Sequence, residues 1–111
     1  MTYSCDRILK ALGDPTRRLV LERVATEGGA VVEIARSLEV TRPAVSQHLR
    51  VLKAAGLVTD RREGTRRYYQ ANPAAIDAVR TYLDRFWDLA FASFRQSVER
   101  QLRGGGQDSR P

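Results

Sequence analysis

Apolar residues recur every three or four positions through most of the chain, a spacing that predicts helices with one buried face. We expect a first helix to be capped by Ser4 and to end at Gly13, with an apolar side made of Ile8, Leu9 and Leu12. A second helix is expected to begin at Asp14-Pro15, an N-cap followed by proline in the first turn, and to stop at Gly28-Gly29.

The middle of the chain predicts two short helices joined by a tight turn. The pattern favours a helix from Val31 to Leu38 and a turn at Glu39-Val40. Thr41 can then cap a fourth helix, which has proline in its first turn and ends at Gly56. This order indicates a helix-turn-helix, although many such turns have glycine where this chain has Glu39.

After Gly56 the pattern changes from helical to extended. The segments LVTDRR and RRYYQ flank Gly64, which can adopt a positive φ at the tip of a hairpin. A basic hairpin directly after a helix-turn-helix is a wing. We expect at least one of Tyr68 and Tyr69 to pack against the helices.

The longest helical pattern begins at Asn72-Pro73 and continues for about 28 residues. A domain of this size cannot cover the whole apolar stripe of such a helix, so the stripe predicts contact with a second copy of the chain. We expect residues 1–103 to form one DNA-binding and dimerisation domain. The polar segment 104–111 is expected to be a disordered tail.

The fourth helix has a polar side that faces away from its predicted core side. At about 100° per residue, Gln47 and Arg50 lie opposite the apolar positions Val45, Leu49 and Leu52. Glutamine pairs well with adenine, and arginine with guanine or phosphate. The residues expected to contact DNA, including those of the helix start and the wing, are Thr41, Arg42, Pro43, Ser46, Gln47, Arg50, Arg62, Thr65, Arg66 and Arg67.

Charge favours the same region. The chain carries a net charge of +6, and residues 41–70 hold seven basic side chains against two acidic ones, so the excess is local. Such a basic segment indicates an anionic polymer as partner, here double-stranded DNA. No apolar run approaches the roughly 18 residues of a membrane span, and the N-terminus does not resemble a signal peptide, so we expect a cytoplasmic protein.

These segments together resemble the ArsR/SmtB family of winged-helix repressors. The likeness rests on LGDPTRRLVLERV, EIARSLEVTRPAVSQHLRVLKAAGLV and REGTRRYYQ, and it covers about residues 6–90. It implies a mainly α, dimeric winged helix-turn-helix with Thr41 to Ala55 as recognition helix. It also implies dimerisation through the first and last helices, for which the candidate interface residues are Ile8, Leu12, Val79, Leu83, Phe86, Trp87, Phe91 and Phe94.

The metal-binding residues of many family members are missing from this chain. The resemblance aligns the Cys-x-Cys of arsenic sensors with Ala30 and Val32, and the last helix has Asp77 and Asp84 but no histidine. We therefore expect no metal, no cofactor and no enzyme activity, with the effector unknown; His48 is expected to have a structural role. The alternatives are a general DNA-coating or protein-binding winged helix, or a redox-switched repressor through Cys5.

Overall fold

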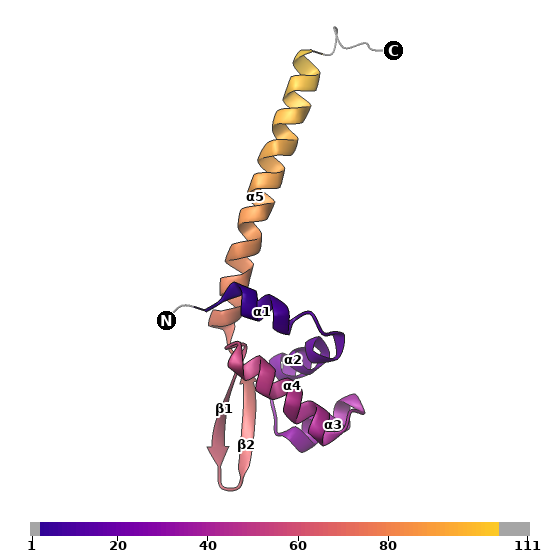
Figure 1. The fold of residues 1–111 in the computed structure, drawn as a ribbon, viewed down its shortest axis with the longest axis vertical. Helices are drawn as coiled ribbons and strands as arrows, with labels where there is room; N and C mark the ends of the chain where they lie inside the picture. The colour runs from indigo at the N-terminus through magenta and orange to yellow at the C-terminus, as the bar shows by residue number, and fades with distance from the viewer. Residues whose placement is uncertain (1–2, 105–111) are drawn as a thin grey trace. The chain divides into compact units, whose positions relative to one another are not determined.

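The structure is a computed structural model that describes residues 3–104. It contains four short helices, a hairpin and one long helix (Figure 1). Their bounds are α1 Cys5–Ala11, α2 Pro15–Glu27, α3 Val31–Leu38, α4 Arg42–Ala54, β1 Val58–Glu63, β2 Arg66–Ala71 and α5 Pro73–Arg103. The chain divides into two compact units, residues 1–79 and 80–111. Within the described residues, no helix is both long enough and apolar enough to cross a membrane.

Local polar contacts set the helix starts, as the sequence predicts. The side chains of Ser4, Asp14 and Thr41 accept hydrogen bonds from backbone amides in the first turns of α1, α2 and α4. In α3, the Glu33 carboxylate accepts the Ala30 amide at 3.0 Å, which satisfies an amide at the start of that helix. The predicted helix-turn-helix is confirmed, with α3 and α4 in contact.

The turn between α3 and α4 places a non-glycine residue in the left-handed region. Glu39 has φ 56° and ψ 41°, and its amide donates to the carbonyl of Ala35. A left-handed conformation costs an L-residue roughly 1–2 kcal/mol relative to a right-handed one. The turn therefore forms without glycine, at a local cost that the packing of the two helices has to offset.

The core of the first unit comes from all five helices and β1, and its most completely buried side chains include Ile34, Leu49, Leu52 and Leu57. Tyr69 packs against this core, which confirms that a wing tyrosine contributes to it. Two residues expected at the dimer interface also belong here: Ile8 is fully buried and Val79 is 9% exposed. Each therefore has almost no surface left for a partner within the described chain, and the interface itself stays a prediction.

The hairpin is antiparallel, with Val58 opposite Ala71 at its base and Glu63 opposite Arg66 at its tip. Gly64 has φ 64° and open space on the side where a Cβ would lie, so the predicted tip glycine is confirmed. At the base, Gly29 and Tyr69 exchange two backbone hydrogen bonds of 3.2 and 2.9 Å. The link between α2 and α3 therefore holds β2 at its outer edge.

Residues 80–103 of the second unit are helical throughout. Their apolar side chains are largely exposed: Leu83 50%, Phe86 53%, Trp87 68%, Phe91 49% and Phe94 64%. Trp87 and Phe91 stack with ring centroids 6.0 Å apart. We call Leu83, Trp87, Phe91 and Phe94 the aromatic stripe, because at about 100° per residue they share one side of the helix. The segment 105–111, most of the expected tail, lies outside the described residues.

Candidate nucleic-acid interface

The polar side of α4 is exposed. Val45, Leu49 and Leu52 are buried, whereas Pro43, Ser46, Gln47 and Arg50 all lie at the surface. Arg50 donates from Nη1 to the Gln47 Oε1 at 3.2 Å, so the two side chains meet on one face. Together they present an amide and a guanidinium in adjacent positions, the donor and acceptor types that pair with purine edges.

The start of α4 is also open to solvent. Thr41, Arg42 and Pro43 are exposed, and the Thr41 hydroxyl accepts the Ala44 amide at 3.3 Å. Pro43 has no N–H, and the Ala44 and Val45 amides donate to Thr41, so the donors left here are the Thr41 hydroxyl and the Arg42 amide. A helix N-terminus also favours an anion. This end of α4 is therefore suited to a phosphate oxygen.

The wing carries a second set of exposed cations. Arg62, Thr65 and Arg66 are all exposed, and Arg62 forms no ion pair among the described residues. Arg66 donates from Nη1 to the Tyr68 hydroxyl at 3.4 Å, and its guanidinium lies 5.9 Å from the centre of the Tyr68 ring. The ring therefore restrains Arg66 without neutralising its charge.

Arg67 differs from Arg62 and Arg66 because its guanidinium already forms an ion pair with an acid. Its Nη1 lies 2.7 Å from Asp60 Oδ2, and Lys53 Nζ lies 2.9 Å from Asp60 Oδ1. The Asp60 side chain is 8% exposed. Hydrogen bonds from Lys53 and then from Arg67 lower the pKa of Asp60, and the bond to Asp60 raises the pKa of Arg67.

His48 and Cys5 lie away from the exposed polar face. His48 is partly buried, and its Nδ1 is enclosed with no hydrogen-bond partner among the described residues, which agrees with a packing role. Cys5 is also partly buried, with Sγ 3.7 Å from the carbonyl of Ala78.

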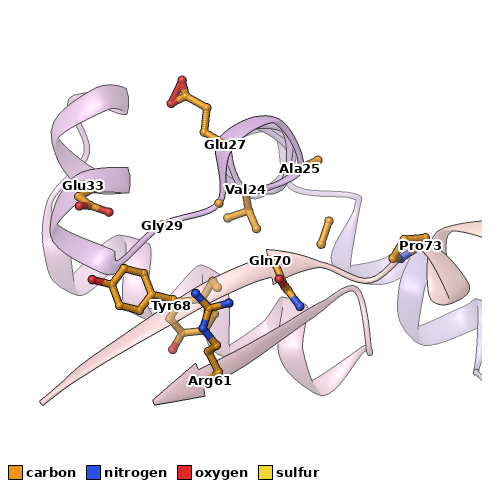
Figure 2. Close-up of a pocket in the computed structure, with 12 residues that line it drawn as sticks. Val24, Ala25, Glu27, Gly29, Glu33, Arg61, Tyr68, Gln70 and Pro73 are labelled. Atoms are coloured by element: carbon orange, nitrogen blue, oxygen red, sulfur yellow. The ribbon is translucent and has the colours of Figure 1, made fainter. Parts of the chain in front are cut away.

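An open cleft of about 550 Å³ lies between the hairpin and the link from α2 to α3 (Figure 2). On the hairpin side, Figure 2 shows Arg61 beside the Tyr68 ring, and the guanidinium carbon is 5.6 Å from the ring centre. The charged side chains of the cleft already have partners: Arg61 pairs with Glu63, and Glu27 pairs with Arg23. Glu33 accepts the Ala30 amide through Oε1 but forms no ion pair among residues 3–104, so the cleft offers one uncompensated acid and no uncompensated cation in that range.

The part of the chain that the structure describes contains no group of three or more His, Cys, Asp or Glu side chains arranged to hold a metal ion. Ala30, the N-cap residue of α3, is buried, Val32 in α3 is partly buried, and Asp77 in α5 is exposed. Asp84 is exposed in the second unit.

Sequence reasoning missed the roles of Lys53, Asp60 and Arg61. Asp60 is an acid within the most basic segment of the chain, and that anomaly was the available signal. Its two partners lie on different elements, so only the folded arrangement brings them together.

Known proteins resemble this chain in sequence and in fold. The family model for "Bacterial regulatory protein, arsR family" matches residues 14–60. The HTH-type transcriptional regulator Rv2034 of Mycobacterium tuberculosis is 54% identical over 99 residues, covering 88% of this chain and 92% of that protein. The transcriptional repressor SdpR of Bacillus subtilis is 32% identical over 71 residues, covering 64% and 79%.

A solved structure adds a similar fold. It is described as a homodimeric winged helix-turn-helix DNA-binding domain from Mycobacterium bovis, a possible ArsR-family transcriptional regulator. The match has a TM-score of 0.59 and 30% identity, and it covers 95% of this chain and 86% of that one.

Proposed function

The chain belongs to the arsR family of bacterial regulatory proteins, and from that premise we propose that it is a homodimeric repressor of an inverted-repeat operator. Family membership makes it a DNA-binding transcriptional regulator and not an enzyme. The observation that carries the finer proposal is the exposed pair Gln47 and Arg50 on α4, in the same compact unit as a wing with exposed arginines.

In this proposal α4 lies in the major groove and reads bases. Gln47 takes the adenine N6 and N7 positions, and Arg50 takes a guanine edge or a phosphate. Pro43 and Ser46 line the same exposed surface. The Thr41 hydroxyl and the side chain and amide of Arg42 bind the phosphate backbone and thereby fix the register of the helix.

The wing holds the DNA rather than reading it. Arg62 and Arg66 neutralise phosphates or enter a narrow minor groove, and Thr65 at the tip supplies a hydroxyl donor. These contacts add affinity to any duplex, so they contribute little to the choice of sequence.

Two copies of the chain join through the aromatic stripe. The exposed Trp and Phe side chains of this helix form a larger continuous apolar surface than a small monomer usually exposes to water. The Mycobacterium bovis relative is described as homodimeric, which supports the same assembly here. Leu12 and Phe86 lie at the surface or partly so and remain candidates for the edge of the interface.

The repressor does not respond to metal through the sites known in the family. Ala30 and Val32 have no ligand atoms in their side chains, and α5 has no histidine to join Asp77 and Asp84. Blocking a promoter by occupancy needs no ligand, so repression by the free dimer is the function that these residues support.

The test distinguishes base-specific contacts of α4 from phosphate contacts of the wing. Wild-type protein selects a duplex from a random pool, and an inverted repeat with half-sites about one helical turn apart is expected. Gln47→Ala should then weaken binding to that duplex by about 1–3 kcal/mol per half-site and leave a scrambled duplex almost unaffected. Arg66→Ala should weaken both duplexes alike and lower the slope of log K against log salt by about 0.9 per lost contact.

Two results would contradict the proposal. If the selection recovers no common sequence, the protein coats DNA without specificity. If Gln47→Ala and Arg66→Ala behave identically across sequences and salt, α4 is not the reading helix.

A further inference from the structure

Asp60 joins three elements with one carboxylate. Its Oδ1 accepts Lys53 from the last turn of α4, and its Oδ2 accepts Arg67 from β2, while Asp60 itself lies on β1. The acid is 8% exposed, whereas the two cations are 49% and 50% exposed. The sheltered member of the network is therefore the single acid, and both of its oxygens are occupied.

The three elements are those that carry the proposed DNA contacts. Lys53 follows Arg50 by one helical turn, and Arg67 is adjacent to Arg66 in β2. Arg67 also stands directly opposite Arg62 in the hairpin register, where two like charges repel. Asp60 compensates the charge of Arg67 and so reduces its repulsion of Arg62. The charge of Arg62 itself stays unpaired.

We propose that Asp60 is a positioning residue for DNA recognition, which fixes the wing against the recognition helix through Lys53 and Arg67. In this arrangement Lys53 and Arg67 hold Asp60 and are not phosphate contacts. The inference rests on the proposed function, in which α4 and the wing bind the same duplex. Asp60 would set the distance between these two surfaces.

Coulomb's law alone predicts the opposite effect. An acid within a basic, DNA-binding segment repels the phosphates, so its removal should tighten binding to every duplex. A positioning role predicts weaker binding to the selected duplex, since a wing that moves independently of α4 meets the backbone in the right place only part of the time. The sign of the change distinguishes the two.

The experiment compares Asp60→Asn with Glu63→Gln, a matched control on the same strand. Both variants remove one negative charge from an ion pair, but Glu63 is 56% exposed and pairs with Arg61 of its own strand, so it joins no two elements. Binding is measured at several salt concentrations to the duplex that wild-type protein selects from a random pool, and to a scrambled duplex of equal length. Thermal melting monitors folding of each variant.

Asp60→Asn should lose about tenfold in affinity for the selected duplex, if each of two wings keeps its productive position about one-third of the time. On the scrambled duplex α4 has no fixed register, so a wing that moves independently can still reach a phosphate, and binding there should be unchanged or tighter. Glu63→Gln should bind both duplexes as tightly as wild type or slightly better. The proposal is overturned if Asp60→Asn matches Glu63→Gln, or if it weakens binding to both duplexes equally.

Arg67→Gln is a second, independent variant that tests the positioning role even if Asp60→Asn fails to fold. It should weaken binding to the selected duplex without lowering the salt slope, whereas Arg66→Ala lowers that slope. A slope reduced by about 0.9 per subunit would make Arg67 a phosphate contact and refute the positioning role. Failure of the proposed function is distinct from either result, because wild-type protein would then select no duplex at all.

Discussion

Trp87 and Leu89 provide a paired test of the dimer. They are 68% and 66% exposed on the same helix, but two residues correspond to about 200° of rotation, so they lie on opposite sides of α5. Trp87 belongs to the aromatic stripe and Leu89 does not. Replacing each by glutamate introduces the same charge at almost the same exposure, and only the side of the helix differs.

The expected magnitude follows from the exposed area of Trp87. A tryptophan buries about 200 Å² in a typical interface, so 68% exposure leaves about 140 Å² to be covered by a partner. At about 25 cal/mol per Å² this amounts to about 3.5 kcal/mol per subunit, and a two-fold interface counts it twice. Halving the total of about 7 kcal/mol for incomplete burial leaves about 3.5 kcal/mol, a weakening of the dimer by more than 100-fold.

Analytical ultracentrifugation across nanomolar to micromolar concentrations measures this change directly. Trp87→Glu should sediment as a monomer where wild type is a dimer, and it should bind the selected duplex far more weakly because one half-site acts alone. Leu89→Glu should change the dimer dissociation constant by only about two- to threefold, as expected for an exposed surface substitution. Equal dimer affinities for the two variants would refute the assignment of the stripe as the interface.

Three further predictions concern stability and ligands. Asp60 has a lowered pKa in the folded protein, so its contribution to stability is present above pH about 4 and is lost as the pH falls through the pKa of the folded state. Denaturant titrations should therefore show that acidification lowers the free energy of unfolding less for Asp60→Asn than for wild type. Gly64→Ala should lower the free energy of unfolding by about 1 kcal/mol, because alanine is strained at a positive φ. Gly56→Ala should lower it by about 2–3 kcal/mol, because the added Cβ would lie 2.8 Å from the Tyr3 ring. That clash would also disturb the 3.0 Å hydrogen bond that the Tyr3 hydroxyl accepts from Asn72. Elemental analysis should find no stoichiometric zinc, cadmium or arsenic, and DNA titrations should not change when these are added; a bound metal that releases the DNA would contradict the metal-independent function.

The sequence predicted the helices well because their ends carry local signals. The expected helix Val31–Leu38 has the same bounds in the structure, since Gly28-Gly29 precedes it and a left-handed Glu39 follows it. The long helix was expected to have about 28 residues, and the structure gives it 31, a difference within the usual uncertainty of helix ends. Capping residues act within one turn, so a linear pattern contains them.

The sequence did not predict which residues each buried or charged side chain contacts. Periodicity identified Ile8 as apolar and facing inward, but it did not distinguish the core of one chain from an interface between two. Arg67 resembled the other wing arginines until the hairpin register and the end of α4 brought Asp60 to it. Contacts between distant elements depend on the folded geometry, which spacing along the chain does not encode.

The proposed dimer would tie helix formation in residues 80–103 to protein concentration. Among these residues only Tyr82 is even partly buried within the chain, whereas most helical stability in proteins comes from packing of an amphipathic face against other elements. In the proposed dimer, pairing through the aromatic stripe would supply that packing, so assembly and local folding would occur together. A dilute chain would fray here and become a better substrate for proteases, and the cell would retain mainly those copies that have found a partner.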